Sequence, residues 1–193
     1  MRIRKGSYGY LQNLRKVSLL KSLLLLAAVF AVYFAARLYF HTNKNVFSIL
    51  AALGALPAGR SVVVTVMSMR ARSASPQAKA AVDQVKGLDN AGFDLYLTGY
   101  EHAFSLSHAA VVGHRVAGLT EDEGTDMGLC RSHIEQMLEK DGQRGFEVRI
   151  FRDPDEYAQY LRTLVSETHE ADRTGADTEA EDRAMTMLYS ISL

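Results

Sequence analysis

The first 72 residues contain no aspartate and no glutamate. Eleven of the 22 lysines and arginines lie in that stretch, whereas all 22 acidic residues follow it. The net charge of zero is therefore the sum of roughly +11 in the first part and −11 in the second. Such an asymmetry indicates that the two parts of the chain occupy different physical environments.

Cysteine is scarce, since Cys130 is the only one. It excludes a disulfide within the chain and is compatible with a reducing compartment. The chain also lacks the Walker A and Gly-x-Gly-x-x-Gly motifs that bind phosphates and dinucleotides, and it lacks the Gly-x-Ser-x-Gly elbow that would mark Ser105 or Ser107 as a nucleophile. We therefore predict no catalytic residue and no cofactor.

Two long apolar segments occupy the part that has no acids. Residues 17–40 and 46–69 each have 24 residues, and about 20 apolar residues are enough to cross the hydrocarbon core of a bilayer. The polar stretch 41–45 separates them. Together they predict a membrane α-helical hairpin of two transmembrane helices, residues 17–69, after a basic N-terminal segment, residues 1–16. A cleaved signal peptide is disfavoured, because no small-residue cleavage site follows residue 36.

Basic residues flank the predicted hairpin mainly on one side. Six of them lie at or before Lys21 and four follow the second helix, whereas Arg37 and Lys44 lie near the connecting loop. The positive-inside rule then places both termini in the cytoplasm and makes the chain a multi-pass protein of the cell membrane. The lipid bilayer is its first predicted partner. The basic start also suits nucleic acid, but no binding motif supports that partner, so none is predicted.

Arg60 is the one charge deep inside the second segment. It lies nine residues before Met69, about 13 Å along a helix and near the middle of the hydrocarbon. Pro57 should kink this helix by removing one hydrogen bond, which frees a carbonyl. Arg60 then either reaches that carbonyl, water or lipid phosphates, or it contacts a carboxylate on another protein. A homo-oligomer through the transmembrane helices is a further candidate partner. A rival interpretation breaks the second helix at Pro57–Arg60.

The remainder predicts a small cytoplasmic α+β domain, residues 73–168, of order α-β-β-β-α-β-α. Ser75 caps a helix that runs from Pro76 to about residue 91. Strands follow at 93–98, 103–112 and 115–119, then a helix at 127–140, a strand at 146–151 and a helix that begins near Asp153. Residues 169–193 are predicted to be an acidic linker and a short C-terminal helix, which either docks on the domain or binds a partner.

Several polar residues of this domain are candidates for a metal or catalytic site. His102, His108 and His114 have a six-residue spacing that matches no metal-ligand motif, and the loop 122–126 lacks the spacing of a calcium-binding loop. Cys130 and His133 lie one helical turn apart, but nothing marks the orienting group that a nucleophile pair needs. No metal site is predicted.

The element order resembles the core of restriction-endonuclease-like folds. That resemblance implies an acid on the second strand and an acid-x-lysine on the third, which would hold a divalent metal. The corresponding stretch, Ala103–Leu119, contains neither an acid nor a lysine. The sequence therefore favours a non-catalytic binding or assembly module at the membrane. The alternative is a membrane-anchored enzyme with a restriction-endonuclease-like domain that lacks this motif.

Overall fold

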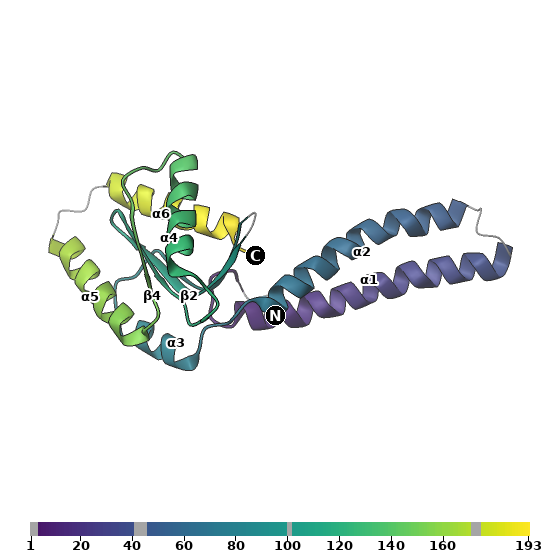
Figure 1. Ribbon diagram of the computed structural model, residues 1–193, viewed down its shortest axis with the longest axis horizontal. Helices are drawn as coiled ribbons and strands as arrows, with labels where there is room; N and C mark the ends of the chain where they lie inside the picture. The colour runs from purple at the N-terminus through teal and green to yellow at the C-terminus, as the bar shows by residue number, and fades with distance from the viewer. Residues whose placement is uncertain (1–3, 41–45, 100–101, 171–174) are drawn as a thin grey trace. The chain divides into compact units, whose positions relative to one another are not determined.

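The computed structural model describes residues 4–40, 46–99, 102–170 and 175–193 (Figure 1). These contain six helices and one four-stranded mixed sheet. The chain divides into two compact units, of which one contains Met1–Leu11 with Ala71–Leu193 and the other Gln12–Arg70. We call the first the α/β unit and the second the helical unit.

The helical unit consists almost entirely of two helices, α1 (Tyr10–Phe40) and α2 (Val46–Arg70). Both are long and apolar enough to cross a membrane. α1 begins seven residues before the predicted residue 17, because Ser7 accepts a hydrogen bond from the Tyr10 amide and starts the helix there. α2 continues through Pro57 as a single helix to Arg70, so the alternative in which it breaks at Pro57–Arg60 is not seen.

The α/β unit begins with α3 (Pro76–Asp83), which is shorter than predicted. Ser75 caps it, since its hydroxyl accepts a hydrogen bond from the Ala78 amide. The helix does not reach residue 91 because Gly87 has φ +84, outside the helical region, and the Asn90 carbonyl already accepts from Val111 on the sheet. The apolar periodicity of residues 85–91 was therefore misleading.

The sheet has the strand order β1-β2-β3-β4. Its strands are β1 (Ala91–Thr98), β2 (Ala103–Val112), β3 (Arg115–Leu119) and β4 (Glu147–Phe151). The first three are antiparallel, whereas β4 runs parallel to β3 after the crossover through α4 (Met127–Lys140). Gly113 takes φ +60 in the tight turn between β2 and β3, where a glycine has no steric cost.

Helices cover both faces of the sheet (Figure 1). On one face, α4 and α6 (Gly175–Ile191) pack on the first core cluster, which includes Leu97, Leu106, Ile134 and Leu188. On the other, α3 and α5 (Pro154–Glu170) pack on the second, which includes Val82, Leu119, Tyr157 and Leu161. All eight of these side chains are buried, so the unit has a core on each side of the sheet.

The prediction of an acidic linker is corrected by α5 and α6. α5 extends to Glu170 and α6 begins at Gly175, so the described part of that stretch is helical. The buried Glu181 of α6 accepts hydrogen bonds from the Gly113 amide at 2.6 Å and from Asn90 Nδ2 at 3.2 Å. An acid-rich sequence suggested solvation, but this carboxylate has fixed partners inside the unit. Ala184, Met185, Met187 and Leu188 lie in the core, as a docked helix requires.

Candidate functional site

Asp94 lies in a buried polar cluster of the α/β unit. It is 2% exposed and takes a left-handed backbone conformation, with φ 57. Its carboxylate accepts hydrogen bonds from the Ala74 amide at 2.7 Å and from the Leu11 amide at 3.3 Å. One side chain therefore holds the first turn of α1 and the segment that follows α2.

The left-handed backbone of Asp94 also changes the face of the sheet toward which the odd-numbered side chains of β1 point. Phe93 packs with the α3/α5 core, whereas Leu95 packs with the α4/α6 core although both are odd-numbered. β2 changes face at the same level, because Leu106 belongs to the α4/α6 core and His108 contacts Phe93 and Tyr157. This switch points the Asp94 carboxylate toward the two segments.

Serines of β2 and a glutamate extend the cluster along the segment Ala71–Ser75. The Arg72 amide donates to Ser105 Oγ at 3.0 Å, and the Ser75 amide donates to Glu121 Oε2 at 2.9 Å. Ser107 Oγ donates to the same glutamate oxygen at 2.7 Å. Three of these four residues bind backbone amides of residues 72–75, which connect α2 to α3. We therefore call Asp94, Ser105, Ser107 and Glu121 the linker clamp.

Electrostatics favour the charged form of Glu121. Burial alone would raise the pKa of this carboxyl, but hydrogen bonds from Ser75 and Ser107 and the positive charge of Arg72 outweigh burial and lower the pKa. A carboxylate that accepts amides in this way acts as an anchor. Sequence reasoning missed the clamp. Its available signal was Asp94, an acid inside the alternating strand pattern of residues 93–98.

The helical unit has its own polar contacts, and they are buried between its two helices. Thr65 Oγ1 donates to Ser22 Oγ at 3.4 Å, Ser18 and Ser68 hydroxyls lie 3.4 Å apart, and Arg15 Nε donates to the Ser68 carbonyl at 2.7 Å. We call Ser18, Ser22, Thr65 and Ser68 the hydroxyl ladder. All four are less than 10% exposed. Further along, Gly54 lets Val29 approach α2 closely.

Arg60 is exposed on the helical unit, and among the described residues it has no hydrogen-bond or ion-pair partner. It lies three residues after Pro57 in α2. Its predicted role as an intramembrane partner contact stays a prediction, and so does the kink at Pro57. The surrounding α2 surface is apolar, with Leu53 and Leu56 58% and 72% exposed.

The three histidines of the predicted turns and strands do not come together. His108 is buried, and its Nδ1 lies 2.7 Å from Tyr157 Oη. Burial lowers its pKa to about 3, so it is neutral at physiological pH. His102 is exposed and His114 lies against Phe146. Within the described residues, no group of three or more histidines, cysteines or acids has metal-binding geometry.

Cys130 and His133 lack the features of a nucleophile pair. Cys130 is completely buried, and burial followed by the negative charge of Asp126 raises the pKa of its thiol to about 12. The reactive thiolate is therefore disfavoured. His133 borders a surface hollow of about 350 Å³ with His102, and burial lowers the pKa of its ring.

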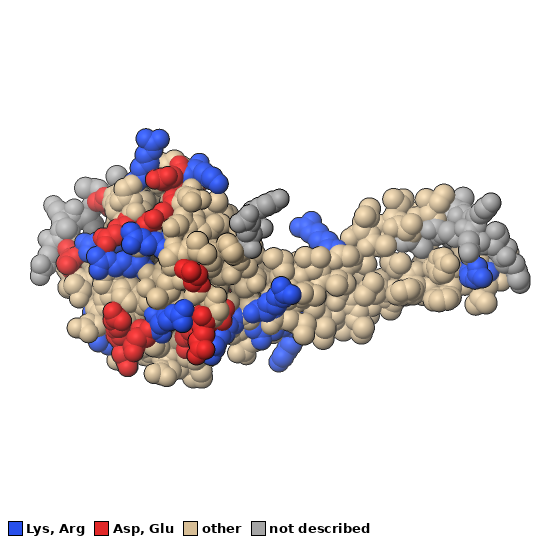
Figure 2. Space-filling view, in the orientation of Figure 1, with Lys and Arg blue, Asp and Glu red and all other residues tan. Residues whose placement is uncertain are grey.

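The strands Ala103–Leu119 hold no carboxylate, as their sequence requires. Among the described residues, the nearest acids in the sequence, Asp94 and Glu121, already accept other hydrogen bonds. Asp94 and Glu121 both accept backbone amides of residues 74 and 75. On the α/β unit, Figure 2 shows basic and acidic side chains interspersed, with no large field of one sign on the face it presents. No protein-family model, no curated protein and no solved structure matches this chain.

Proposed function

We propose that the chain is a multi-pass protein of the cell membrane whose α1 and α2 cross the bilayer as a hairpin. The observation that carries this proposal is the reversed polarity of the helical unit. Leu23, Phe34 and Leu56 are 66%, 55% and 72% exposed, while the hydroxyl ladder is buried. Water would oppose both features, whereas lipid favours apolar side chains outside and hydrogen bonds between helices.

The charges at the helix ends support an orientation with both termini and the α/β unit in the cytoplasm. Lys16, Lys21 and Arg70 are exposed at the end of the helical unit that Arg15 and Ser68 join. Their long side chains can place ammonium and guanidinium groups among headgroups, and anionic cytoplasmic lipids attract them. Only Arg37 and Lys44 carry charge near the other end.

The work we propose for the α/β unit is non-catalytic: it binds or assembles a partner at the cytoplasmic surface. The linker clamp supports this, because it uses the buried carboxylates to position chain segments. Arg60 supports a contact inside the membrane with a carboxylate of another protein, since the helices of a second copy supply no acid. An exposed guanidinium at this depth costs about 2.5–3.5 kcal/mol, and such a partner removes part of that cost.

Topology is tested first, with an alkaline phosphatase fusion and a green fluorescent protein fusion after Leu193. We expect fluorescence and no phosphatase activity, since the phosphatase needs the oxidising side of the membrane. An active phosphatase would overturn the cytoplasmic placement. Recovery of the whole chain in the soluble fraction, without detergent, would overturn the membrane hairpin itself.

The Arg60 contact is tested by crosslinking in membranes. Proteins joined to wild type are compared with those joined to Arg60→Leu and to Arg60→Lys. We expect Arg60→Leu to lose a partner that Arg60→Lys keeps, because lysine retains the charge. The same set of partners in all three would show that Arg60 only reaches lipid or water.

A further inference from the structure

The two edges of the sheet differ in whether another segment of the chain hydrogen-bonds to them. At the β1 edge, the Phe93 amide donates to the Gly6 carbonyl at 2.8 Å and the Leu193 amide donates to the Tyr96 carbonyl at 2.9 Å. Ser192 also forms a bridge with Leu97. At the other edge, within the described residues, β4 pairs with β3 alone. An edge strand whose outward backbone groups have no partner is a template for pairing with another strand.

The hydrogen bonds between β4 and β3 show which backbone groups of β4 point away from β3. The Glu147 amide donates to His114 and the Phe151 carbonyl accepts from Thr120, so these two residues bond to β3. Since hydrogen-bonding direction alternates along a strand, Val148 and Ile150 direct their amides and carbonyls away from β3. Among the described residues, neither has a hydrogen bond on that side.

A groove of about 690 Å³ runs along this edge. All five residues of β4 line it, together with the first turns of α4 and α5. Met127 adds apolar surface, being 37% exposed. Val148 is buried, so an incoming strand has to displace the side chains beside it. Arg131 and Arg149 are more than half exposed, and the surface ion pair that each forms is weak. Arg149 also lies over the Tyr160 ring, 5.2 Å from its centroid.

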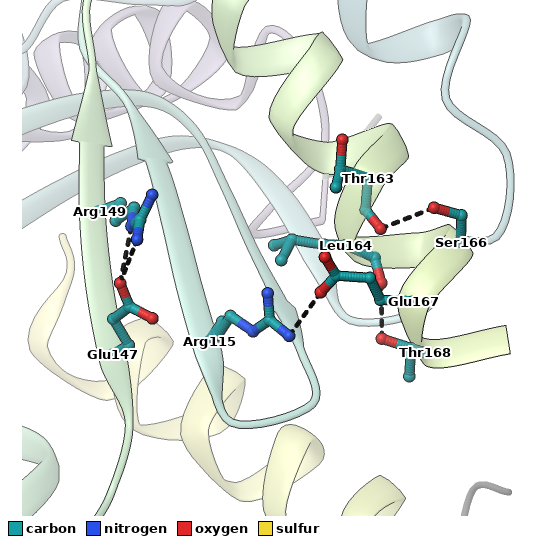
Figure 3. A network of polar contacts seen from close by, with 8 residues as sticks. All are labelled: Arg115, Glu147, Arg149, Thr163, Leu164, Ser166, Glu167 and Thr168. Atoms are coloured by element: carbon teal, nitrogen blue, oxygen red, sulfur yellow. Dashed lines mark hydrogen bonds and ion pairs between the residues drawn. The ribbon is translucent and has the colours of Figure 1, made fainter. Parts of the chain in front are cut away.

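We propose that this edge binds the same edge of a second copy, which joins the two sheets through antiparallel β4 strands with Val148 opposite Val148 of the partner subunit. The pairing satisfies the outward backbone groups of both chains. Glu147 then lies opposite Arg149 of the partner subunit, twice by symmetry, and Phe146 lies opposite Ile150 of the partner subunit. Figure 3 shows Glu147 and Arg149 in contact on β4, beside the Arg115–Glu167 ion pair that joins β3 to α5.

Charge selects this register over its neighbours. Centring the pair on Arg149 puts two arginines directly opposite each other, and centring it on Ile150 puts Glu147 opposite Asp153 of the partner subunit. Like charges directly opposite on a sheet destabilise it, whereas opposite charges stabilise it. The alternation Glu147-Val148-Arg149 is thus complementary to itself. This assembly uses the α/β unit, so it is distinct from association through the membrane helices.

A charge reversal tests the register, with the full chain in lipid nanodiscs or dilute detergent and its oligomeric state measured by mass photometry. Arg149→Glu should weaken dimerisation about tenfold, because two attractive pairs become repulsive. Adding Glu147→Arg in the same chain should restore it. The matched control is the exposed pair on α6, where Arg183→Glu alone or with Glu179→Arg should change nothing.

Disulfide trapping gives a second reading that does not depend on affinity. Chains with Glu147→Cys are mixed with chains that carry Arg149→Cys, whose Cα atoms would lie about 4.5 Å apart, within disulfide range. We expect a mixed disulfide in this sample and little in either variant alone. A wild type that stays monomeric, a double reversal that stays as weak as Arg149→Glu, or trapping no better than with Glu179→Cys and Arg183→Cys would each overturn the proposal.

Discussion

The two units of the molecule bury opposite kinds of side chain. In the α/β unit, leucines, valines and isoleucines fill two cores and most charged residues lie at the surface. In the helical unit, hydroxyls are buried between the helices, and leucines and phenylalanines are exposed along them. One rule explains both patterns when the helical unit lies in lipid, as proposed. Water solvates apolar side chains poorly and lipid solvates hydroxyls poorly, so each unit buries the groups that its surroundings solvate poorly.

The exposure of apolar side chains therefore indicates the solvent of a unit better than its composition does. Both units contain many apolar residues, and hydropathy alone cannot separate a buried core helix from a membrane helix. Low burial of the apolar side chains of α1 and α2 is what supports a lipid environment for them.

The same leucine-to-alanine substitution should have different effects on stability in the two units. Leu106→Ala in β2 removes a completely buried side chain and should destabilise the α/β unit by about 2–5 kcal/mol. Leu53→Ala in α2 removes one that is 58% exposed, and should change the stability of the α/β unit by less than about 0.5 kcal/mol. Urea-dependent proteolysis in detergent measures both. Equal effects would contradict the assignment of separate units.

Removing the carboxylate of Asp94 should loosen both segments that it holds. Asp94→Ala leaves two buried amides without an acceptor, which costs about 1–3 kcal/mol. Hydrogen exchange at Leu11 and Ala74 should accelerate together. Asp94→Asn is the intermediate case, because asparagine tolerates the left-handed backbone and keeps one of the two acceptor oxygens, so only one of the two amides should lose its acceptor. If either amide exchanges as slowly in Asp94→Ala as in wild type, the shared clamp is wrong.

Acid should destabilise the α/β unit through His108. Its pKa is about 3 when folded and about 6.5 when unfolded, so between these values the unfolded chain binds a proton that the folded chain does not. Stability therefore falls as the pH drops below 6.5, by up to about 1.4 kcal/mol per unit. His108→Gln should flatten this dependence, whereas His102→Gln, at an exposed histidine, should not. Identical pH profiles for wild type and His108→Gln would refute it.

The hydroxyl ladder should give the smallest effect. The Ser22–Thr65 hydrogen bond joins α1 to α2, and such bonds in membrane helices average about 0.6 kcal/mol. A double-mutant cycle with Ser22→Ala and Thr65→Val, followed by thermal unfolding in bicelles, isolates that coupling. Thr163→Val, on the exposed surface of α5, supplies the control. Additive single effects would mean that the two hydroxyls do not act together.

Local signals in the sequence predicted most of the sheet. The bounds of β2 and β3 agree with the structure because an apolar run, a Gly113 turn and a second apolar run leave few alternatives. Ser75 and Asp153 marked helix starts for the same reason, since capping depends on adjacent residues. Arg60 and Pro57 were found by their type alone, and their roles stay predictions.

Long-range contacts explain what the sequence did not reveal. The end of α3 at Asp83 depends on Asn90 joining β2, and the helical conformation of residues 175–183 accompanies the partners that Glu181 finds in residues far from it in sequence. The linker clamp joins residues 11, 74 and 94, which no local pattern relates. The open edge of β4 likewise follows from strand order, which periodicity does not specify.

The position of α6 in the chain has a consequence for biosynthesis. Leu188 and Met185 complete the core beside Leu97, and Lys5 donates to the carbonyls of Tyr189 and Ser192. During translation, both apolar helices leave the ribosome long before these residues are made. In the proposed membrane hairpin, α1 and α2 would therefore enter the bilayer while the α/β unit still lacks α6, and Lys5 would wait for carbonyl partners that are made after the whole sheet.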